Sequence, residues 1–294
     1  MEVAGEVKKI VIDVHVHVFP PAVIEQIEDY LCKDAFLKEI CSSPVHKYAT
    51  VEDLLQEMDR CGVDKAAISG FASSDEGLCR EMNAYVLESA AQYPERLIPM
   101  AVINPLAPGM EKELSQLGEA GFAGVGELFP WGQDFSLESA AADRLAALCS
   151  ERSLPLLLHV NENVGHHYTG KGDISVKEAA LFASAHRELV IIFAHWGGGL
   201  PFFELMPELR EKLGNVYYDT AAGPFLYDKS IYRVAREIGV LDKILLGTDY
   251  PLLSPKRYLR ELEESGLVPE ELKKICGENA RRLFFGSQEH VHTD

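Results

Sequence analysis

The chain has 294 residues, of which 47% are hydrophobic, and its 28 lysines and arginines against 46 aspartates and glutamates give a net charge of −18. A chain of this length and apolar content can bury a full core, so disorder along its whole length is excluded. The acidic balance and the lack of any basic run argue against a nucleic-acid partner, because phosphate backbones recruit lysine and arginine.

Short apolar runs recur along the sequence, and an amphipathic stretch follows most of them. Several runs are nearly continuous Val, Ile, Leu and Ala, which is typical of strands buried on both faces of a parallel sheet. Strand and helix alternate about eight times, which predicts an α/β fold, a (β/α)8 TIM barrel, as a single domain over 1–294. In chain order the expected strands are 10–16, 63–69, 97–103, 122–127, 154–159, 189–194, 216–219 and 243–247.

The helices between these strands are predicted from capping signals and apolar periodicity. Thr50 and Asp53 form a capping-box pattern ahead of one such helix. An insert over about 20–60 follows the first strand and is expected to add helices at the barrel mouth. The segment 269–285 is expected to close the barrel, and the polar tail 286–294 to fray. The expected helices are 22–31, 35–40, 50–61, 76–92, 110–119, 137–149, 176–186, 201–213, 229–238 and 255–264.

Six side chains that can ligate a divalent ion stand at the carboxyl ends of the expected strands, where (β/α)8 enzymes place their active sites. A buried histidine is more often hydrogen-bonded than metal-bound. Here, however, single histidines end two apolar strands at the rim, and an aspartate follows a third strand there. The pattern predicts a centre for one or two divalent ions, with zinc the expected metal. The six residues are His15, His17, Glu127, His159, His195 and Asp249.

His15 and His17 are two residues apart on one strand, so both imidazoles face the same side and can converge on one ion. Asp13 precedes His15 by two residues and is expected to orient one of the ligands through a hydrogen bond. The same spacing recurs at His290 and His292 in the polar tail, where we expect no site.

Five motifs occur in order on the expected strands and the closing segment, and together they resemble the amidohydrolase superfamily. They are most similar to its amidohydrolase-related branch, which includes aminocarboxymuconate-semialdehyde decarboxylase and other metal-dependent hydrolases and decarboxylases. The resemblance covers nearly the whole chain and is weak for substrate. The motifs are Ile12-Asp-Val-His-Val-His17, His159, Ala194-His-Trp-Gly-Gly-Gly-Leu-Pro-Phe202, Leu246-Gly-Thr-Asp-Tyr-Pro251 and Glu278-Asn-Ala-Arg-Arg-Leu-Phe284.

The resemblance implies that His15, His17 and Asp249 are metal ligands. It makes His159 a ligand or a substrate contact. It makes His195 a ligand or the group that polarises the substrate and transfers protons.

Glu127 departs from the decarboxylase pattern and resembles the fourth-strand carboxylate that TatD-type deoxyribonucleases use as a metal ligand. As a ligand, Glu127 would bridge the ion held by the first strand to a second ion held by His159 and His195. The alternative is an ion pair between Glu127 and an arginine or lysine at the barrel mouth.

Zinc held by His and carboxylate ligands with an open position lowers the pKa of a bound water toward about 7. The expected reaction is therefore hydrolysis of an amide, ester or lactone in a small molecule. Asp249 would accept a proton and His195 would stabilise the oxyanion. The alternatives are nonoxidative decarboxylation of an aromatic or enoic acid and a non-catalytic metal-binding protein.

Four residues are expected to contact the substrate: Phe19, Trp196, and His166 and Lys171 of the loop after the fifth strand. That loop, 165–172, nearly matches a phosphate-binding loop, but Gly172 replaces the Ser or Thr that would reach magnesium. Further aromatic residues expected near the mouth are Phe129, Trp131 and Phe225.

The six cysteines form no Cys-x-x-Cys pair, which favours reduced thiols in a cytoplasmic protein. Residues 1–9 lack the pattern of a signal peptide, and no apolar run has the length of a membrane span. The expected partner is a small-molecule substrate, with no nucleic acid and no membrane. The sequence is compatible with a monomer or a homodimer.

Overall fold

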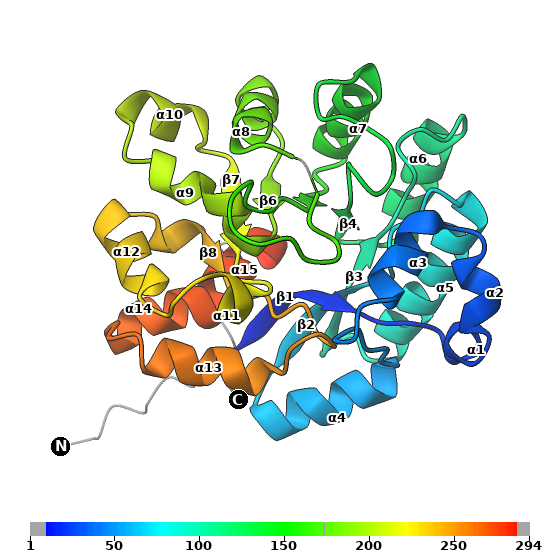
Figure 1. Cartoon of the computed structure of the whole chain (residues 1–294), viewed down its shortest axis with the longest axis horizontal. Coiled ribbons are helices and arrows are strands. Elements are labelled where there is room, and N and C mark those ends of the chain that lie inside the picture. Colours follow the sequence, from blue (N-terminus) through cyan, green and yellow to red (C-terminus); the bar gives the residue numbers. More distant parts are fainter. Residues whose placement is uncertain (1–9, 173, 287–294) are drawn as a thin grey trace.

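Eight parallel strands pair in chain order in the computed structural model, which describes residues 10–172 and 174–286. Helices surround the strands (Figure 1). Val16 pairs with Tyr250 in a parallel bridge, and the Val14 N–H donates to the Leu246 carbonyl at 2.8 Å, so the sheet nearly closes into a barrel. The predicted (β/α)8 barrel is confirmed. The strands are β1 (Ile12–His17), β2 (Lys65–Ser69), β3 (Leu97–Ala101), β4 (Gly124–Leu128), β5 (Leu156–Leu158), β6 (Ile191–Phe193), β7 (Val216–Asp219) and β8 (Ile244–Leu245).

Most helices lie where the sequence predicts them. The Thr50 side chain accepts from the Asp53 N–H and completes the capping box of α4 (Val51–Cys61). The others include α5 (Glu76–Gln92), α6 (Met110–Ala120), α7 (Ala140–Glu151), α8 (Val176–Ala185), α12 (Ile231–Ile238), α13 (Pro255–Glu263), α14 (Pro269–Lys273) and α15 (Asn279–Phe285).

Two of the predicted helices are each split in two. The segment 201–213 forms α9 (Leu200–Phe203) and α10 (Pro207–Lys212), because Pro207 has no N–H to continue the first helix and instead starts the second. The segment 22–31 forms α1 (Pro21–Glu25) and α2 (Ile27–Leu31), which meet at a non-helical Gln26.

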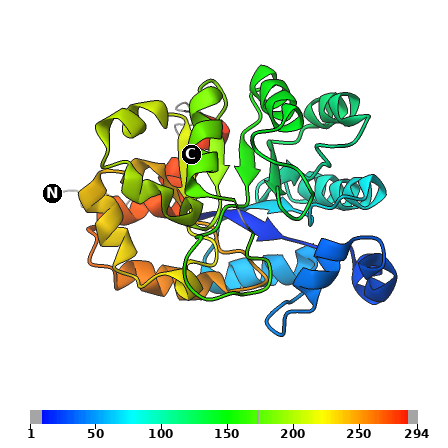
Figure 2. The ribbon, with the colours of Figure 1, turned by 45° about the horizontal axis from the view of Figure 1, so that its top comes forward.

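The insert after β1 covers the carboxyl ends of the strands, as predicted. Phe36 of α3 (Ala35–Cys41) packs on Phe71 and Phe129, with ring centroids 5.8 and 5.2 Å away. The loop after β5 crosses the same end (Figure 2) and touches the insert, because an added Cβ at Gly170 would lie 2.6 Å from the Ile40 side chain. Two segments distant in sequence therefore enclose the barrel mouth together.

The strand β1 carries a bulge that bears on the site. Asp13 pairs with Ala66 and Val16 with Ile68, so three steps along β1 match two along β2. A bulge breaks the two-residue alternation of side chains along a strand. Asp13 and His15 therefore do not share a face in the way that their spacing predicts.

Among the described residues, no helix is both long and apolar enough to cross a membrane. None of the six cysteines, all of them described, forms a disulfide. The tail residues from 287 on, with His290 and His292, lie outside the described part of the chain, as do residues 1–9.

Candidate metal centre

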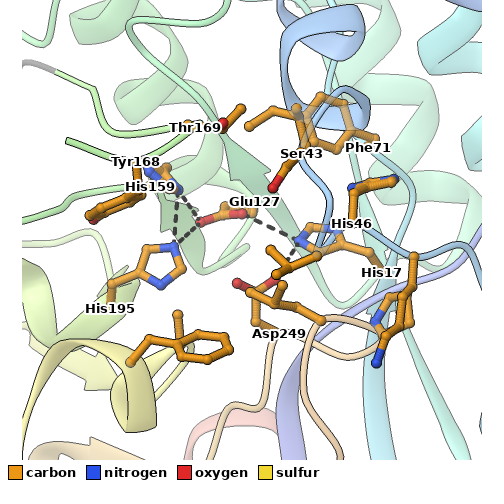
Figure 3. A pocket seen from close by; sticks show the side chains of 18 of the residues that line it. His17, Ser43, His46, Phe71, Glu127, His159, Tyr168, Thr169, His195 and Asp249 are labelled. Carbon is orange, nitrogen blue, oxygen red and sulfur yellow. Dashed lines mark hydrogen bonds and ion pairs between the residues drawn. The ribbon is translucent and has the colours of Figure 1, made fainter.

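The six predicted ligands meet at the carboxyl end of the barrel. Five of them line the floor of a cavity of about 520 Å³ (Figure 3), and His15 lies fully buried directly behind that floor. They come from β1, β4 and the residues that follow β5, β6 and β8. In a parallel barrel these ends converge, which is why residues so far apart in sequence share one site.

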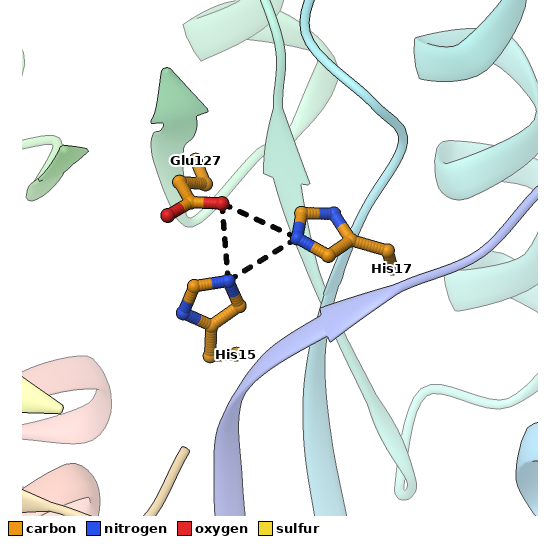
Figure 4. Close-up of side chains that lie close together, drawn as sticks. All are labelled: His15, His17 and Glu127. Atoms are coloured by element: carbon orange, nitrogen blue, oxygen red, sulfur yellow. Dashed lines mark hydrogen bonds and ion pairs between the residues drawn. The ribbon is translucent and has the colours of Figure 1, made fainter. Parts of the chain in front are cut away.

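His15, His17 and Glu127 form one compact group (Figure 4). The two Nε2 atoms are 3.2 Å apart, and Glu127 Oε2 lies 3.2 Å from that of His15 and 3.3 Å from that of His17. Asp249 Oδ1 lies somewhat further away, 3.8 and 3.6 Å from the same two nitrogens. Three lone-pair atoms thus face one point, with a second carboxylate beside them.

The other oxygen of Glu127 faces a second group. Oε1 lies 2.9 Å from His159 Nδ1 and 3.3 Å from His195 Nε2, and these two nitrogens are 3.0 Å apart. In the described part of the chain, every ion pair of Glu127 is with an imidazole, so the alternative of a pairing with arginine or lysine is wrong. The buried carboxylate of Glu127 therefore contacts both pairs of histidines, with one oxygen facing each pair.

Three of the four imidazoles are held from behind by their Nδ1 atoms. His17 Nδ1 donates to the Gly70 carbonyl at 3.2 Å, and His195 Nδ1 to the Ala221 carbonyl at 3.0 Å. In a neutral imidazole, a proton on Nδ1 leaves Nε2 with a bare lone pair. Rings held this way present Nε2 as a metal ligand, the usual arrangement at protein metal sites.

The partner behind His15 is not the one predicted. Asp13 accepts from the His15 main-chain N–H at 3.2 Å and from the Thr248 hydroxyl at 2.5 Å, but it does not touch the ring. The ring Nδ1 instead donates to Asp219 Oδ2 at 2.8 Å. The β1 bulge explains the error.

Two of the predicted ligands, and the residue that follows one of them, have left-handed backbone conformations. The φ angles are 56° for His195, 57° for Trp196 and 59° for Asp249. Such conformations cost non-glycine residues about 1–3 kcal/mol each and persist where surrounding contacts fix them. Here the His195 N–H donates to Asp219 Oδ1, and the Asp249 N–H donates to the His15 carbonyl, both at 2.9 Å.

In the metal-free site the buried carboxylate and imidazole groups shift one another's pKa values. Burial opposes ionisation of Glu127, but the charges of His15 and His159 and their hydrogen bonds outweigh it and hold the pKa of Glu127 well below its usual range. Burial likewise disfavours the charged form of His15, yet Glu127 and Asp219 raise the pKa of His15 well above 6.5. For His195, burial is outweighed by the hydrogen bond to Glu127 and its charge, which raise the pKa to about 9.

Zinc affinity is therefore expected to fall as pH falls. A divalent ion binds histidine only in its deprotonated form, and below pH of about 9 it must displace the His195 proton. We expect the apparent affinity to rise with pH from 6.5 to at least about 9, because the proton of His15, whose pKa is also raised, must be displaced as well. Competition against a chelator at several pH values measures this, and an affinity that does not change over that range would contradict the assignment.

The predicted substrate contacts divide into two pairs. Phe19 and His166 line the cavity. Lys171 does not, because its Nζ is held by Glu162 at 3.4 Å and by carbonyls of its own loop. Trp196 does not either: it is 1% exposed and packs against Tyr232. Lys171 and Trp196 are therefore not retained as substrate contacts.

The aromatic walls of the cavity are formed by Phe19, Phe71, Phe129 and Phe225. Phe71 and Phe129 stack on each other at a centroid distance of 4.8 Å. Trp131, 41% exposed, is not among the lining residues. The walls are largely apolar, while the floor carries the ionisable groups.

Asp219, His46 and the wall residue Phe71 are among the residues of the site that were missed from the sequence. Asp219 is the last residue of β7, so a search for carboxylates at every strand end would have found it. His46, which lines the cavity, lies in the insert, and no strand or motif marks it. Burial, with a smaller contribution from the nearby charge of His17, lowers the pKa of His46 to about 4, so His46 is neutral at pH 7.

Comparison with known proteins agrees with this architecture. The sequence model of a family described as amidohydrolase matches residues 12–286. Among solved structures, 5-carboxyvanillate decarboxylase from Sphingomonas paucimobilis has a TM-score of 0.72 at 16% identity, covering 94% of this chain and 99% of that one. The enzyme of the same name from Novosphingobium aromaticivorans was solved in complex with manganese and 4-hydroxy-3-methoxy-5-nitrobenzoic acid. It has a TM-score of 0.72 at 16% identity, covering 96% of this chain and 97% of that one.

A hydratase has the same fold. The structure of 4-oxalomesaconate hydratase from Rhodopseudomonas palustris has a TM-score of 0.67 at 20% identity, covering 94% of this chain and 95% of that one. Identities this low show a shared fold and do not by themselves show a shared reaction.

Proposed function

The chain belongs to the amidohydrolase family, and from that premise we propose that it is a divalent-metal-dependent enzyme that decarboxylates a small aromatic or enoic carboxylic acid. The observation that carries the proposal is the site itself: imidazole nitrogens and carboxylate oxygens that can ligate a metal converge at the floor of a cavity with apolar, aromatic walls. Solved structures of similar fold support the choice of reaction, since two of those described above are decarboxylases.

The ligand atoms have the spacing that a metal ion requires. An ion about 2.1 Å from its ligands separates neighbouring ligand atoms by about 3.0 Å in octahedral and about 3.4 Å in tetrahedral geometry. The three separations among His15 Nε2, His17 Nε2 and Glu127 Oε2 are 3.2, 3.2 and 3.3 Å. We propose these atoms and Asp249 as ligands of one ion, and Glu127 Oε1 with His159 and His195 as the second ligand set.

A divalent ion bound there would supply a Lewis acid that stabilises negative charge developing on the substrate. The comparisons leave zinc as one candidate and add manganese, which is bound in the Novosphingobium enzyme. Reconstitution of metal-free protein with each ion, followed by metal analysis, distinguishes the two candidates and gives the number of ions per chain.

The side chains of the cavity would bind the substrate, deliver a proton and stabilise negative charge. The stacked Phe71 and Phe129 form an apolar wall on which a planar substrate can lie. In decarboxylation the bond between the ring or alkene carbon and the carboxyl carbon breaks, carbon dioxide leaves, and the electron pair left on carbon takes up a proton. We assign delivery of that proton to Asp249, whose side chain is 17% exposed to the cavity against 2% for Glu127. His195 faces the same floor and would stabilise negative charge on the substrate.

Hydrolysis of an amide, ester or lactone is the second candidate, and one observation favours it. Glu127 presents one oxygen to each histidine pair, which is how a carboxylate bridges two ions, and paired ions are common in hydrolytic enzymes.

A substrate panel separates the two reactions. Metal-loaded protein is incubated with aromatic and enoic carboxylic acids and, in parallel, with amides, esters and lactones of similar size, and carbon dioxide and free acid are measured. We expect carbon dioxide release, abolished by chelation and restored by the metal. Hydrolysis without carbon dioxide release would replace the main proposal by the second. Metal-loaded protein that turns over no member of either panel would count against both.

A further inference from the structure

We infer that Asp219 is a positioning residue for the metal centre: its two carboxylate oxygens fix the imidazole of His15 and the main chain of His195 at the same time. The inference rests on the proposed function in so far as that function needs the metal. No motif singled Asp219 out, and it does not line the cavity.

Asp219 is completely buried, and both of its oxygens are used. Oδ2 accepts from His15 Nδ1 at 2.8 Å. Oδ1 accepts from the main-chain N–H groups of His195 and Ala221, both at 2.9 Å. Because His195 lies in the second ligand set and its own Nδ1 donates to the Ala221 carbonyl, one carboxylate supports ligands of both sets.

The contact between Asp219 and His15 crosses an intervening strand. Asp219 ends β7 and His15 lies on β1, with β8 between them. The chain after β8 passes between the two side chains at Gly247, where an added Cβ would lie 2.9 Å from the His15 Cβ and 3.0 Å from the Asp219 Cβ. Only glycine leaves room for this approach.

The hydrogen bond decides which nitrogen of His15 is free for a metal. A carboxylate can only accept, so Asp219 holds a proton on Nδ1, and in the neutral ring that binds a metal the bare lone pair is then on Nε2, which faces His17 and Glu127. If Nδ1 instead had to accept a hydrogen bond, a neutral ring would carry its proton on Nε2. That proton would point into the ligand set and block it.

The substitution Asp219→Asn tests whether Asp219 determines the tautomer of His15, and it changes the shape of the side chain little. Two main-chain N–H groups require the side-chain oxygen at the Oδ1 position. The amide NH2 of asparagine is then turned toward His15 Nδ1, which can only accept from it. The substitution therefore preserves the support of His195 and reverses the preferred tautomer of His15.

Asp13→Asn is the matched control. Asp13 is also buried and also contacts His15, but through the main-chain N–H rather than the ring. If substitution of any buried aspartate near β1 weakened zinc binding, both variants would show the loss. A loss caused by the wrong tautomer of His15 would appear only in Asp219→Asn.

The experiment measures zinc affinity by chelator competition and thermal unfolding of the metal-free proteins. We expect Asp219→Asn to unfold as cooperatively as the wild type and to bind zinc about 10- to 100-fold more weakly, the usual effect of removing a hydrogen-bond partner behind a ligand. Asp13→Asn should stay close to wild type. Wild-type affinity in a folded Asp219→Asn protein, or an equal loss in both variants, would overturn the inference.

A measurement on the wild type covers the case in which the variant does not fold. The 15N shifts of the His15 imidazole in the zinc-loaded protein, assigned by comparison with His15→Gln, distinguish a protonated Nδ1 with metal on Nε2 from the reverse. Metal on Nδ1 would overturn the role of Asp219. A wild type that is folded but binds no divalent metal would instead overturn the proposed function.

Discussion

Replacing Asp249 with asparagine is expected to lower kcat by about 10²- to 10⁴-fold, the range typical of a lost general acid–base group, while the barrel stays folded. Asp249 lies on the cavity floor, and its carboxylate is 3.6 Å from His17 Nε2. Asparagine keeps the size of the side chain but can neither hold nor deliver the proton. The measurement is steady-state turnover of whichever substrate the panel identifies, with protein loaded to the same metal content.

The control for this variant is metal content. Asp249 is the most distant of the ligands proposed for the first ion, at 3.8 Å from His15 Nε2. We therefore expect saturating metal to load Asp249→Asn fully. Turnover within a few-fold of wild type in the loaded variant would remove Asp249 from the catalytic role.

Glu127→Gln is expected to have the largest effect on metal binding. Substitution of an outer partner alone typically costs 10- to 100-fold in affinity, so loss of a carboxylate that serves both ligand sets should cost more than about 100-fold. The imidazoles should respond as well, because the charge of Glu127 raises the pKa of His15 and of His195. Both values should fall in the metal-free variant. Isothermal titration with zinc and with manganese measures the affinity, and NMR titration measures the histidine pKa values.

Glu162→Gln provides the comparison for loss of one negative charge nearby. Glu162 pairs with Lys171 at 3.4 Å in the loop after β5 and lies outside the floor. Its substitution should leave metal affinity close to that of wild type, since the ion pair and the hydrogen bond of Glu162 are with Lys171 and Tyr168, neither of which is a proposed ligand. A Glu127→Gln protein that binds both metals as tightly as Glu162→Gln would show that Glu127 is not a ligand.

The parts of this molecule that follow from local pattern were predictable from sequence. Continuous apolar runs that alternate with amphipathic stretches specify a barrel, and the barrel brings its strand ends together. His159 and His195, more than thirty residues apart, could for that reason be placed at one site, and they lie 3.0 Å apart.

What sequence did not predict depends on geometry between strands. The bulge in β1 has no local signal, and it turns Asp13 away from the ring of His15. Asp219 reaches that ring across β8 only because Gly247 has no side chain. Trp196 resembles a cavity aromatic in sequence, but the left-handed turn after β6 leaves it packed in the core.

The most direct test is a crystal structure of the metal-loaded protein with anomalous diffraction measured at the absorption edge of the metal. We expect an anomalous peak at coordination distance from His15 Nε2, His17 Nε2 and Glu127 Oε2, with any second peak beside Glu127 Oε1, His159 and His195. Loaded protein with no peak at this floor, and with the metal held elsewhere, would contradict the assignment of the site as a metal centre.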